Sequence, residues 1–282
     1  MMKILAALLC LIPLAASAAS SEEDYIASRD KYIAQFKLKD NEPITDEISK
    51  AEEQARAALE QQMQVIIGAS GVKGAPALGK LNLDSLISGD MGFGLLDGLV
   101  FKVGADTQVL VTTRTLLARW IAAEQEIWKD SPEHGFPPEI DAALRTEDFY
   151  TQALSHDAAV TRYADIPVTG GVAMLITHRQ DIGPSVPREL IVATLTGERL
   201  FIWSAPARSK VAAIPQCSAL WTNAERKAKA LAKKNRDNGD AEGKMLGEGD
   251  AAMRQCFNER ARSQSFFPAL VNQARELVER VR

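Results

Sequence analysis

Apolar residues recur every three to four positions near both ends of the chain, which is the spacing of one face of a helix. Near the N-terminus this pattern predicts helices over residues 21–38 and 46–67. Beyond residue 216 it returns in three stripes, formed by Cys217, Leu220, Trp221, Ala224, Ala228 and Leu231, then by Met253, Cys256, Phe257 and Ala261, and last by Leu270, Val271, Ala274, Leu277, Val278 and Val281. We therefore expect helices at both ends of the chain.

The middle of the chain contains short runs in which apolar and polar residues alternate, or that are rich in β-branched residues, and both are typical of strands. The runs cover residues 99–103, 108–113, 158–163, 172–179, 189–195 and 199–203, while helical spacing returns over 114–128, 139–145 and 147–154. Gly104 and Gly197 lie between successive runs and favour tight turns. This order predicts an α+β fold with a mostly antiparallel sheet packed with the N-terminal helices, and helices on one face of that sheet.

The pattern divides the chain into three expected segments. Residues 1–18 form a signal peptide, residues 19–210 form the α+β main domain, and residues 211–282 form a helical C-terminal region. Within the main domain, residues 68–98 hold eight of the 18 glycines of the chain. A loop of this length within a compact domain is uncommon, so we expect a flexible segment, either a functional flap or a mobile loop.

The signal peptide is indicated by three features at the start of the chain. Lys3 precedes an apolar run over residues 4–14, and Ala16 and Ala18 place small residues at the −3 and −1 positions of a cleavage site. The run is shorter than the roughly 20 residues that cross a bilayer. A buried N-terminal helix is the alternative. Cys10 follows Leu9, whereas a lipidated cysteine follows a small residue, so we expect a periplasmic or secreted protein without a membrane span after cleavage.

Composition and cysteine content fit an exported globular protein. The chain is 46% hydrophobic and 25% charged with a formal charge of −4, which excludes a disordered chain and disfavours nucleic acid as a partner. After cleavage Cys217 and Cys256 remain, and an even pair in an oxidising compartment predicts one disulfide. That bond would join the first two helices of the C-terminal region. Two free buried thiols are the alternative, and a zinc site lacks the paired cysteine spacing it needs.

Two matches to catalytic motifs fail on their context. Residues 74–80 fit the GxxxxGK pattern of a phosphate-binding loop, but Leu81 stands where the magnesium-binding hydroxyl is needed and a predicted helix precedes the loop. Ser70 and Lys73 fit the SxxK pattern of penicillin-recognising enzymes, but the S-D-N and K-T-G elements of those enzymes are missing. No motif identifies a reaction, and we expect no cofactor.

A ligand-binding group is predicted where two strands begin and end. His156 and Asp157 precede one predicted strand, and His178, Arg179 and Asp181 lie at the end of the next. If these strands pair in antiparallel fashion, the two histidines approach each other with the two aspartates beside them, which would suit a metal ion or an anion. The alternative is that all five are surface loop residues.

A second candidate is an acidic segment between two predicted helices. Asn238, Asp240 and Glu242 supply oxygen ligands at alternating positions before Gly243, as in the first half of a helix–loop–helix calcium loop. The bidentate glutamate expected at the twelfth position is replaced by Gly249. A solvated acidic loop is therefore the alternative to a metal site.

Function is predicted here mainly from what the sequence lacks. Because there is no convergent catalytic set, we expect an exported envelope protein that binds a protein partner or a small ligand without catalysis. One alternative is a periplasmic hydrolase that uses His156, His178 and the nearby acids. Another is an immunity-type or inhibitor protein directed against a toxin or a lytic enzyme.

Overall fold

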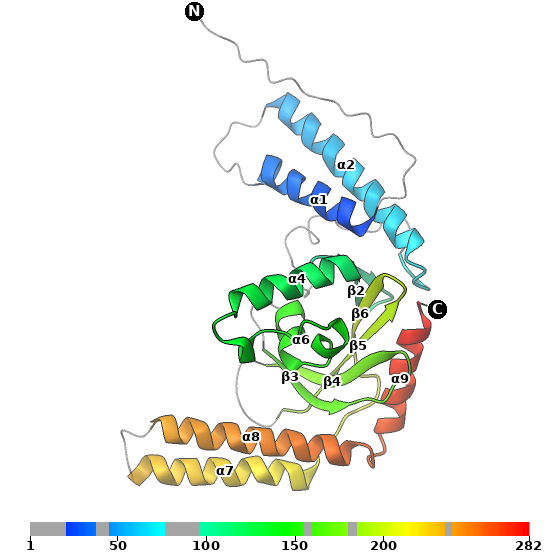
Figure 1. The fold of residues 1–282 in the computed structure, drawn as a ribbon. Coiled ribbons are helices and arrows are strands. Elements are labelled where there is room, and N and C mark those ends of the chain that lie inside the picture. The colour runs from blue at the N-terminus through cyan, green and yellow to red at the C-terminus, as the bar shows by residue number, and fades with distance from the viewer. Residues whose placement is uncertain are drawn as a thin grey trace, which may run out of the picture.

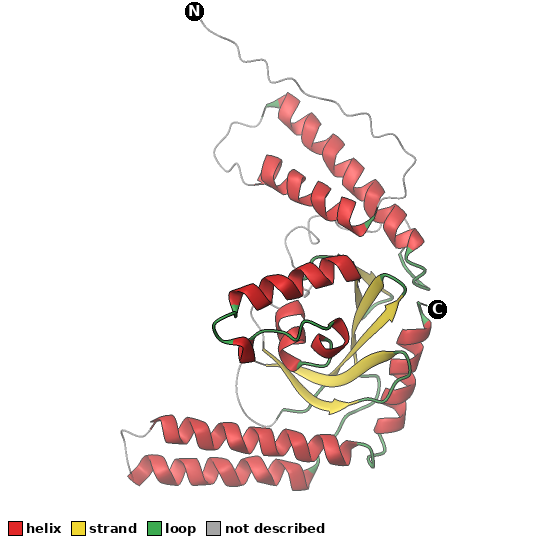
Figure 2. Ribbon diagram, viewed as in Figure 1, coloured by secondary structure: helices red, strands yellow, loops and turns green. Residues whose placement is uncertain are grey.

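The structure is a computed structural model that describes residues 21–37, 45–76, 96–154, 159–179, 185–234 and 239–281. It confirms the predicted α+β class, with one six-stranded antiparallel sheet and helices that precede, interrupt and follow it (Figures 1 and 2). The glycine-rich stretch at 77–95 lies outside the described residues, so its flexibility stays a prediction.

The strands match the predicted runs closely. They are β1 (Leu99–Val103), β2 (Thr107–Thr113), β3 (Ala159–Asp165), β4 (Gly171–Arg179), β5 (Glu189–Thr196) and β6 (Arg199–Pro206). Their order in the sheet is β1-β2-β6-β5-β4-β3, which leaves β1 and β3 at the edges. Gly104 and Gly197 have φ angles of 76° and 61°. These left-handed values suit glycine in the turns that join β1 to β2 and β5 to β6.

Helices cover both faces of the sheet, so the expectation of helices on one face is wrong. Between β2 and β3 lie α4 (Arg114–Ile127), α5 (Ile140–Ala143) and α6 (Glu147–Leu154). Their apolar residues form one core with Leu110, Met174 and Ile202 of the sheet. The opposite face packs against the remaining helices. The strands are buried on both faces because the residues at alternate positions, Leu175 as well as Met174, are apolar.

The N-terminal helices form a hairpin of α1 (Glu22–Tyr32) and α2 (Asp46–Ala69), which lies above the sheet in Figure 1. A π-helical turn, Ile33–Lys37, extends α1. Ser21 caps α1 and its side chain accepts a hydrogen bond from the backbone N–H of Asp24. The buried carboxylate of Glu22 binds Arg199 of β6 at 2.6 Å. This ion pair attaches the start of α1 to the sheet.

The C-terminal region contains α7 (Pro215–Lys234), α8 (Gly239–Ala261) and α9 (Phe267–Glu279). The predicted disulfide is present, with Cys217 of α7 bonded to Cys256 of α8. These two helices form an antiparallel hairpin below the sheet in Figure 1, and α9 runs along its side. None of the helices in the described ranges combines the length and the apolar composition that crossing a bilayer requires.

Candidate anion-binding site

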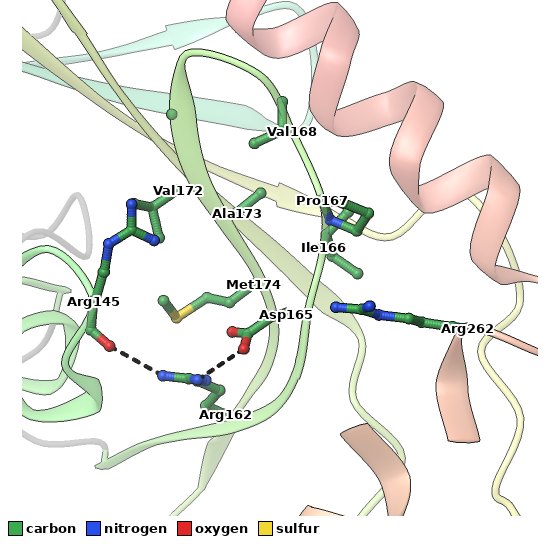
Figure 3. A pocket seen from close by; sticks show the side chains of 11 residues that line it. Arg145, Arg162, Asp165, Ile166, Pro167, Val168, Val172, Ala173, Met174 and Arg262 are labelled. Carbon is green, nitrogen blue, oxygen red and sulfur yellow. Dashed lines mark hydrogen bonds and ion pairs between the residues drawn. The ribbon is translucent and has the colours of Figure 1, made fainter. Parts of the chain in front are cut away.

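A cavity of about 330 Å³ lies where β3 ends and β4 begins (Figure 3). We call it the arginine pocket, since Arg145, Arg162 and Arg262 line it together with Asp165. Its other lining residues are Ile166, Pro167, Val168, Gly171, Val172, Ala173 and Met174. Three arginines and one aspartate leave an excess of positive charge around an otherwise apolar cavity.

An irregularity in β3 places two of the charged residues on the same side of the sheet. Arg162 pairs with Ile176 and Ala164 with Leu175, so Tyr163 is an extra residue that faces no partner in β4. Such a bulge reverses the alternation of side chains along a strand. Arg162 and Asp165 therefore share the face that α6 covers, although three positions separate them.

The guanidinium of Arg162 is held by contacts within the pocket. Its Nη1 donates a hydrogen bond of 3.0 Å to the backbone oxygen of Arg145. Its Nη2 donates one of 2.9 Å to Oδ2 of Asp165. Arg162 and Asp165 therefore balance each other in charge, and together they tie β3 to the segment between α5 and α6.

The other two arginines have no such partner. Arg145 follows α5 and Arg262 follows α8, and neither forms an ion pair or a side-chain hydrogen bond with any residue that the structure describes. Figure 3 shows their side chains approaching the pocket from opposite sides. Two unpaired guanidinium groups at one cavity are an arrangement suited to an anion.

Several contacts fix α8, and therefore Arg262, against the edge strand β3. The backbone N–H of Asp165 donates to Oδ1 of Asn258 at 2.9 Å. The rings of Tyr163 and Phe257 meet edge to face, with their centroids 5.3 Å apart. Arg254 of α8 binds Glu147 of α6 at 2.9 Å, so α8 also contacts the helical layer on the other face. The pocket is thus built by elements from both sides of the sheet.

A buried tyrosine lies within the electrostatic reach of the pocket. The hydroxyl of Tyr150 on α6 is fully buried and has no hydrogen-bond partner among the described residues. Burial raises the pKa of this hydroxyl, and the positive charges of Arg145 and Arg162 act in the opposite direction. The positive charge of the pocket therefore acts on the Tyr150 hydroxyl inside the adjacent core.

Two of the five ligand-binding residues predicted from the sequence lie in the described part of the chain, at the other end of β4 from the pocket. His156, Asp157 and Asp181 are outside the described residues, and His178 and Arg179 are the last two residues of β4. Val160 pairs with His178, which confirms the antiparallel pairing on which the prediction depends. Whether the two imidazoles meet stays a prediction. His178 is seven positions after Gly171 at the pocket, roughly 23 Å along a strand.

The acidic segment expected to be a loop is helical where the structure describes it. Gly239–Ala261 forms α8, so Asp240 and Glu242 lie in its first turn rather than in a calcium loop. Side chains two residues apart on a helix leave on different sides and do not converge on one ion. Asn238 lies outside the described residues, and in the described ranges no group of three or more His, Cys, Asp or Glu side chains could hold a metal.

Reasoning from the sequence missed the arginine pocket because its charged residues come from distant parts of the chain. Arg145, Arg162 and Arg262 share no motif spacing. The sequence feature that comes nearest to predicting the pocket is the pair Arg162 and Asp165. These residues lie three positions apart in and just after a run with the alternation of apolar and polar residues that is typical of a strand. In a regular strand those two side chains would face opposite ways, so the bulge had to be known first.

Comparison of the chain with protein-family models, with curated proteins and with solved structures gives no match. The chemistry of the pocket is therefore what indicates a function.

Proposed function

We propose that the protein is exported and binds a small anionic ligand in the arginine pocket, without catalysing a reaction on it. The observation that carries the proposal is the pair of unpaired guanidinium groups, Arg145 and Arg262, at the same cavity. Arginine forms strong, geometrically defined hydrogen bonds with carboxylate and phosphate groups. An anion between these two side chains would gain such bonds from both.

The size and lining of the pocket narrow the ligand class. A volume of about 330 Å³ lies at the lower end of the range for small-molecule sites. Pro167 and Val168, which are exposed and half-buried, supply apolar surface beside the charged groups. These features favour a compact carboxylate or phosphate compound with a short apolar part, over a polyanion or a bulky ligand.

Export is supported by the N-terminal pattern and by the disulfide. Cleavage after Ala18 would leave α1, which begins at Glu22, within the mature chain. The bond between Cys217 and Cys256 is of a kind that persists in oxidising compartments. N-terminal sequencing of the exported protein should begin at residue 19 or 20, and an intact Met1 would contradict this part of the proposal.

The ligand proposal can be tested by calorimetry and thermal unfolding of the purified protein. Inorganic phosphate, sulfate, citrate and benzoate are suitable probes, because they vary charge and apolar content separately. We expect at least one of them to bind with 1:1 stoichiometry and to raise the melting temperature. Arg145→Ala and Arg262→Ala should each weaken that binding about tenfold, which corresponds to about 1.4 kcal/mol for one lost charge-assisted contact.

Arg260→Ala is the matched control, because Arg260 lies two residues before Arg262 but does not line the pocket. It removes the same charge from the same end of α8 and should leave the affinity unchanged. Absence of binding by every probe would contradict the proposal, as would equal losses from Arg260→Ala and Arg262→Ala.

A further inference from the structure

We infer that the protein has a second ligand site, which takes an apolar acyl chain ending in a carboxylate. The site is a groove of about 480 Å³, which we call the apolar groove. Val186, Pro187, Pro206, Ala207 and Val211 provide its apolar lining, and Arg188, Ser209 and Lys210 complete it. It shares no lining residue with the arginine pocket.

The apolar groove lies at the opposite end of the sheet from the arginine pocket. Some of its residues precede β5, and the others lie at the end of β6 or follow it. The start of β5 and the end of β6 lie side by side, because Glu189 pairs with Pro206. Glu189 also pairs with Ile176, near the end of β4. The groove therefore lies at the end of the sheet to which the sequence assigned ligand-binding residues, including His178 and Arg179.

Hydrogen bonds hold the wall before β5 in place. The hydroxyl of Tyr163 on β3 lies 2.9 Å from Oγ of Ser185. The backbone N–H of Arg188 donates to the oxygen of Ile176 at 3.2 Å, and the oxygen of Arg188 accepts from the N–H of Ala207 at 2.8 Å. This wall is therefore fixed both to the sheet and to the segment on the other side of the groove.

The wall after β6 is fixed by one buried side chain of α9. Gln273 donates from Nε2 to the oxygen of Pro206 at 2.8 Å, and its Oε1 accepts from the N–H of Arg208 at 3.0 Å. Oγ of Ser209 donates to the oxygen of Phe266 at 3.4 Å. Hydrogen bonds within the protein thus hold both walls, which suits a preformed small-molecule site.

The charges of the groove select an anionic head group. Arg188 and Lys210 form no ion pair with any residue in the described ranges, whereas the neighbouring Arg208 is paired with Glu276. The apolar residues that line the same groove offer contact to a hydrocarbon chain. A carboxylate at the end of that chain could pair with these cations. Its negative charge would then not be buried without a partner, which would cost free energy.

An acyl chain fits the groove better than a peptide does. Several backbone groups of its walls are already hydrogen-bonded: the N–H of Arg188 to Ile176, the oxygen of Arg188 to Ala207, and the oxygen of Pro206 and the N–H of Arg208 to Gln273. An extended peptide could not pair with these groups, and each of its own backbone groups that it buried beside them without a partner would cost free energy. A hydrocarbon chain has no such requirement.

The test is calorimetric titration of the purified protein with dodecanoate below its micelle concentration. Hexanoate keeps the head group and shortens the chain, and dodecyltrimethylammonium keeps the chain and reverses the charge. We expect 1:1 binding of dodecanoate, weaker binding of hexanoate by about fourfold for each methylene that leaves the groove, and no saturable binding of the cation.

Variants locate the binding on the protein. Arg188→Ala combined with Lys210→Ala should weaken dodecanoate binding about fourfold to twentyfold, since each exposed cation contributes modestly. Arg260→Ala combined with Lys227→Ala removes the same two charge types away from the groove and should have no effect. Arg262→Ala should also have no effect, which separates this site from the arginine pocket.

Three results would overturn the inference: no binding of dodecanoate, equal binding of dodecyltrimethylammonium, or loss of dodecanoate binding in Arg262→Ala. The comparison of dodecanoate with dodecyltrimethylammonium uses the unaltered protein. It therefore tests the inference even if one of the variants is unstable. The outcome is independent of the proposed function, which phosphate, sulfate, citrate and benzoate test at the other end of the sheet.

Discussion

The close contact between α7 and α8 gives a stability prediction of definite sign. Gly249 of α8 is buried against Ala224 of α7, and a Cβ atom added at Gly249 would lie 2.3 Å from the Cβ of Ala224. Carbon atoms in contact are normally about 3.5–4.0 Å apart. Gly249→Ala therefore requires the two helices to separate by more than about 1 Å at this point.

The helices cannot separate freely, because Cys217 and Cys256 join them. Each cysteine lies seven residues, or about two helical turns, from the Gly249–Ala224 contact. Overpacking of this kind typically costs about 1–3 kcal/mol. Replacement of glycine by alanine within a helix returns about 1 kcal/mol through helix propensity. We expect Gly249→Ala to lower the free energy of unfolding by up to about 2 kcal/mol.

Gly247→Ala is the matched control, because it lies in the same helix and no atom lies within 4 Å of its added Cβ. It gains the propensity term without the clash and should raise the free energy of unfolding by about 0.5–1 kcal/mol. Since propensity cancels between the two variants, the difference between them measures the overpacking alone. We expect that difference to be about 1–3 kcal/mol.

Urea unfolding followed by circular dichroism, with the disulfide intact, measures both variants. Ala224→Gly should partly rescue Gly249→Ala, because it removes the carbon with which the new Cβ collides. A double-mutant cycle should therefore show a favourable coupling between the two sites. If Gly249→Ala is as stable as Gly247→Ala, the helices do not approach as closely as the structure shows, and the reasoning is refuted.

Two further predictions concern stability. Replacing Cys217 and Cys256 by serine should lower the free energy of unfolding by up to about 4 kcal/mol in urea, because the bond closes a loop with a sequence separation of 39; a loss below 1 kcal/mol would mean that the bond hardly restricts the unfolded chain. Thr113→Ala should cost about 0.5–2 kcal/mol, because its hydroxyl caps α4 by accepting from the N–H of Leu116 at 3.2 Å. The same hydroxyl donates a hydrogen bond to the carboxylate of Glu23. Burial acts to raise the pKa of Glu23, but hydrogen bonds outweigh it and bring this pKa below 4.5, and the bond from Thr113 is the largest of them. The stability from Glu23 is therefore present above pH 4.5 and is lost as the pH falls through the lowered pKa. Thr113→Ala should shrink this acid dependence while Thr113→Ser keeps it, and identical melting profiles of the two variants between pH 3 and 6 would contradict the assignment.

The strands were predictable because their signals are local. Alternation over 172–179 and the turn glycines Gly104 and Gly197 place five of the six strands of the described residues within a few residues of their observed bounds. That helices cover both faces of the sheet was harder to predict. Met174 and Leu175 point to opposite faces and are both apolar, but the pattern alone does not say whether one layer of helices or two buries them.

The start of α8 was missed because local preference and tertiary packing disagree there. Gly239, Gly243 and Gly247 each disfavour a helix by about 1 kcal/mol, so the segment resembles a flexible loop in sequence. In the folded chain this segment is the N-terminal part of α8 and pairs with α7. Contacts of this kind override propensity, and a pattern read along one segment does not contain them.

The arginine pocket follows from the way in which the fold protects its edge strand. β3 is an edge of the sheet, and an uncovered edge offers unpaired backbone groups to other chains. Here Asn258 of α8 binds the N–H of Asp165 at the end of that edge. Covering the edge brings the end of α8 next to the segment that joins α5 to α6, although these belong to opposite layers. Arg262 and Arg145 therefore line one cavity because the edge strand is covered. For the same reason, no single segment of the sequence predicts the site.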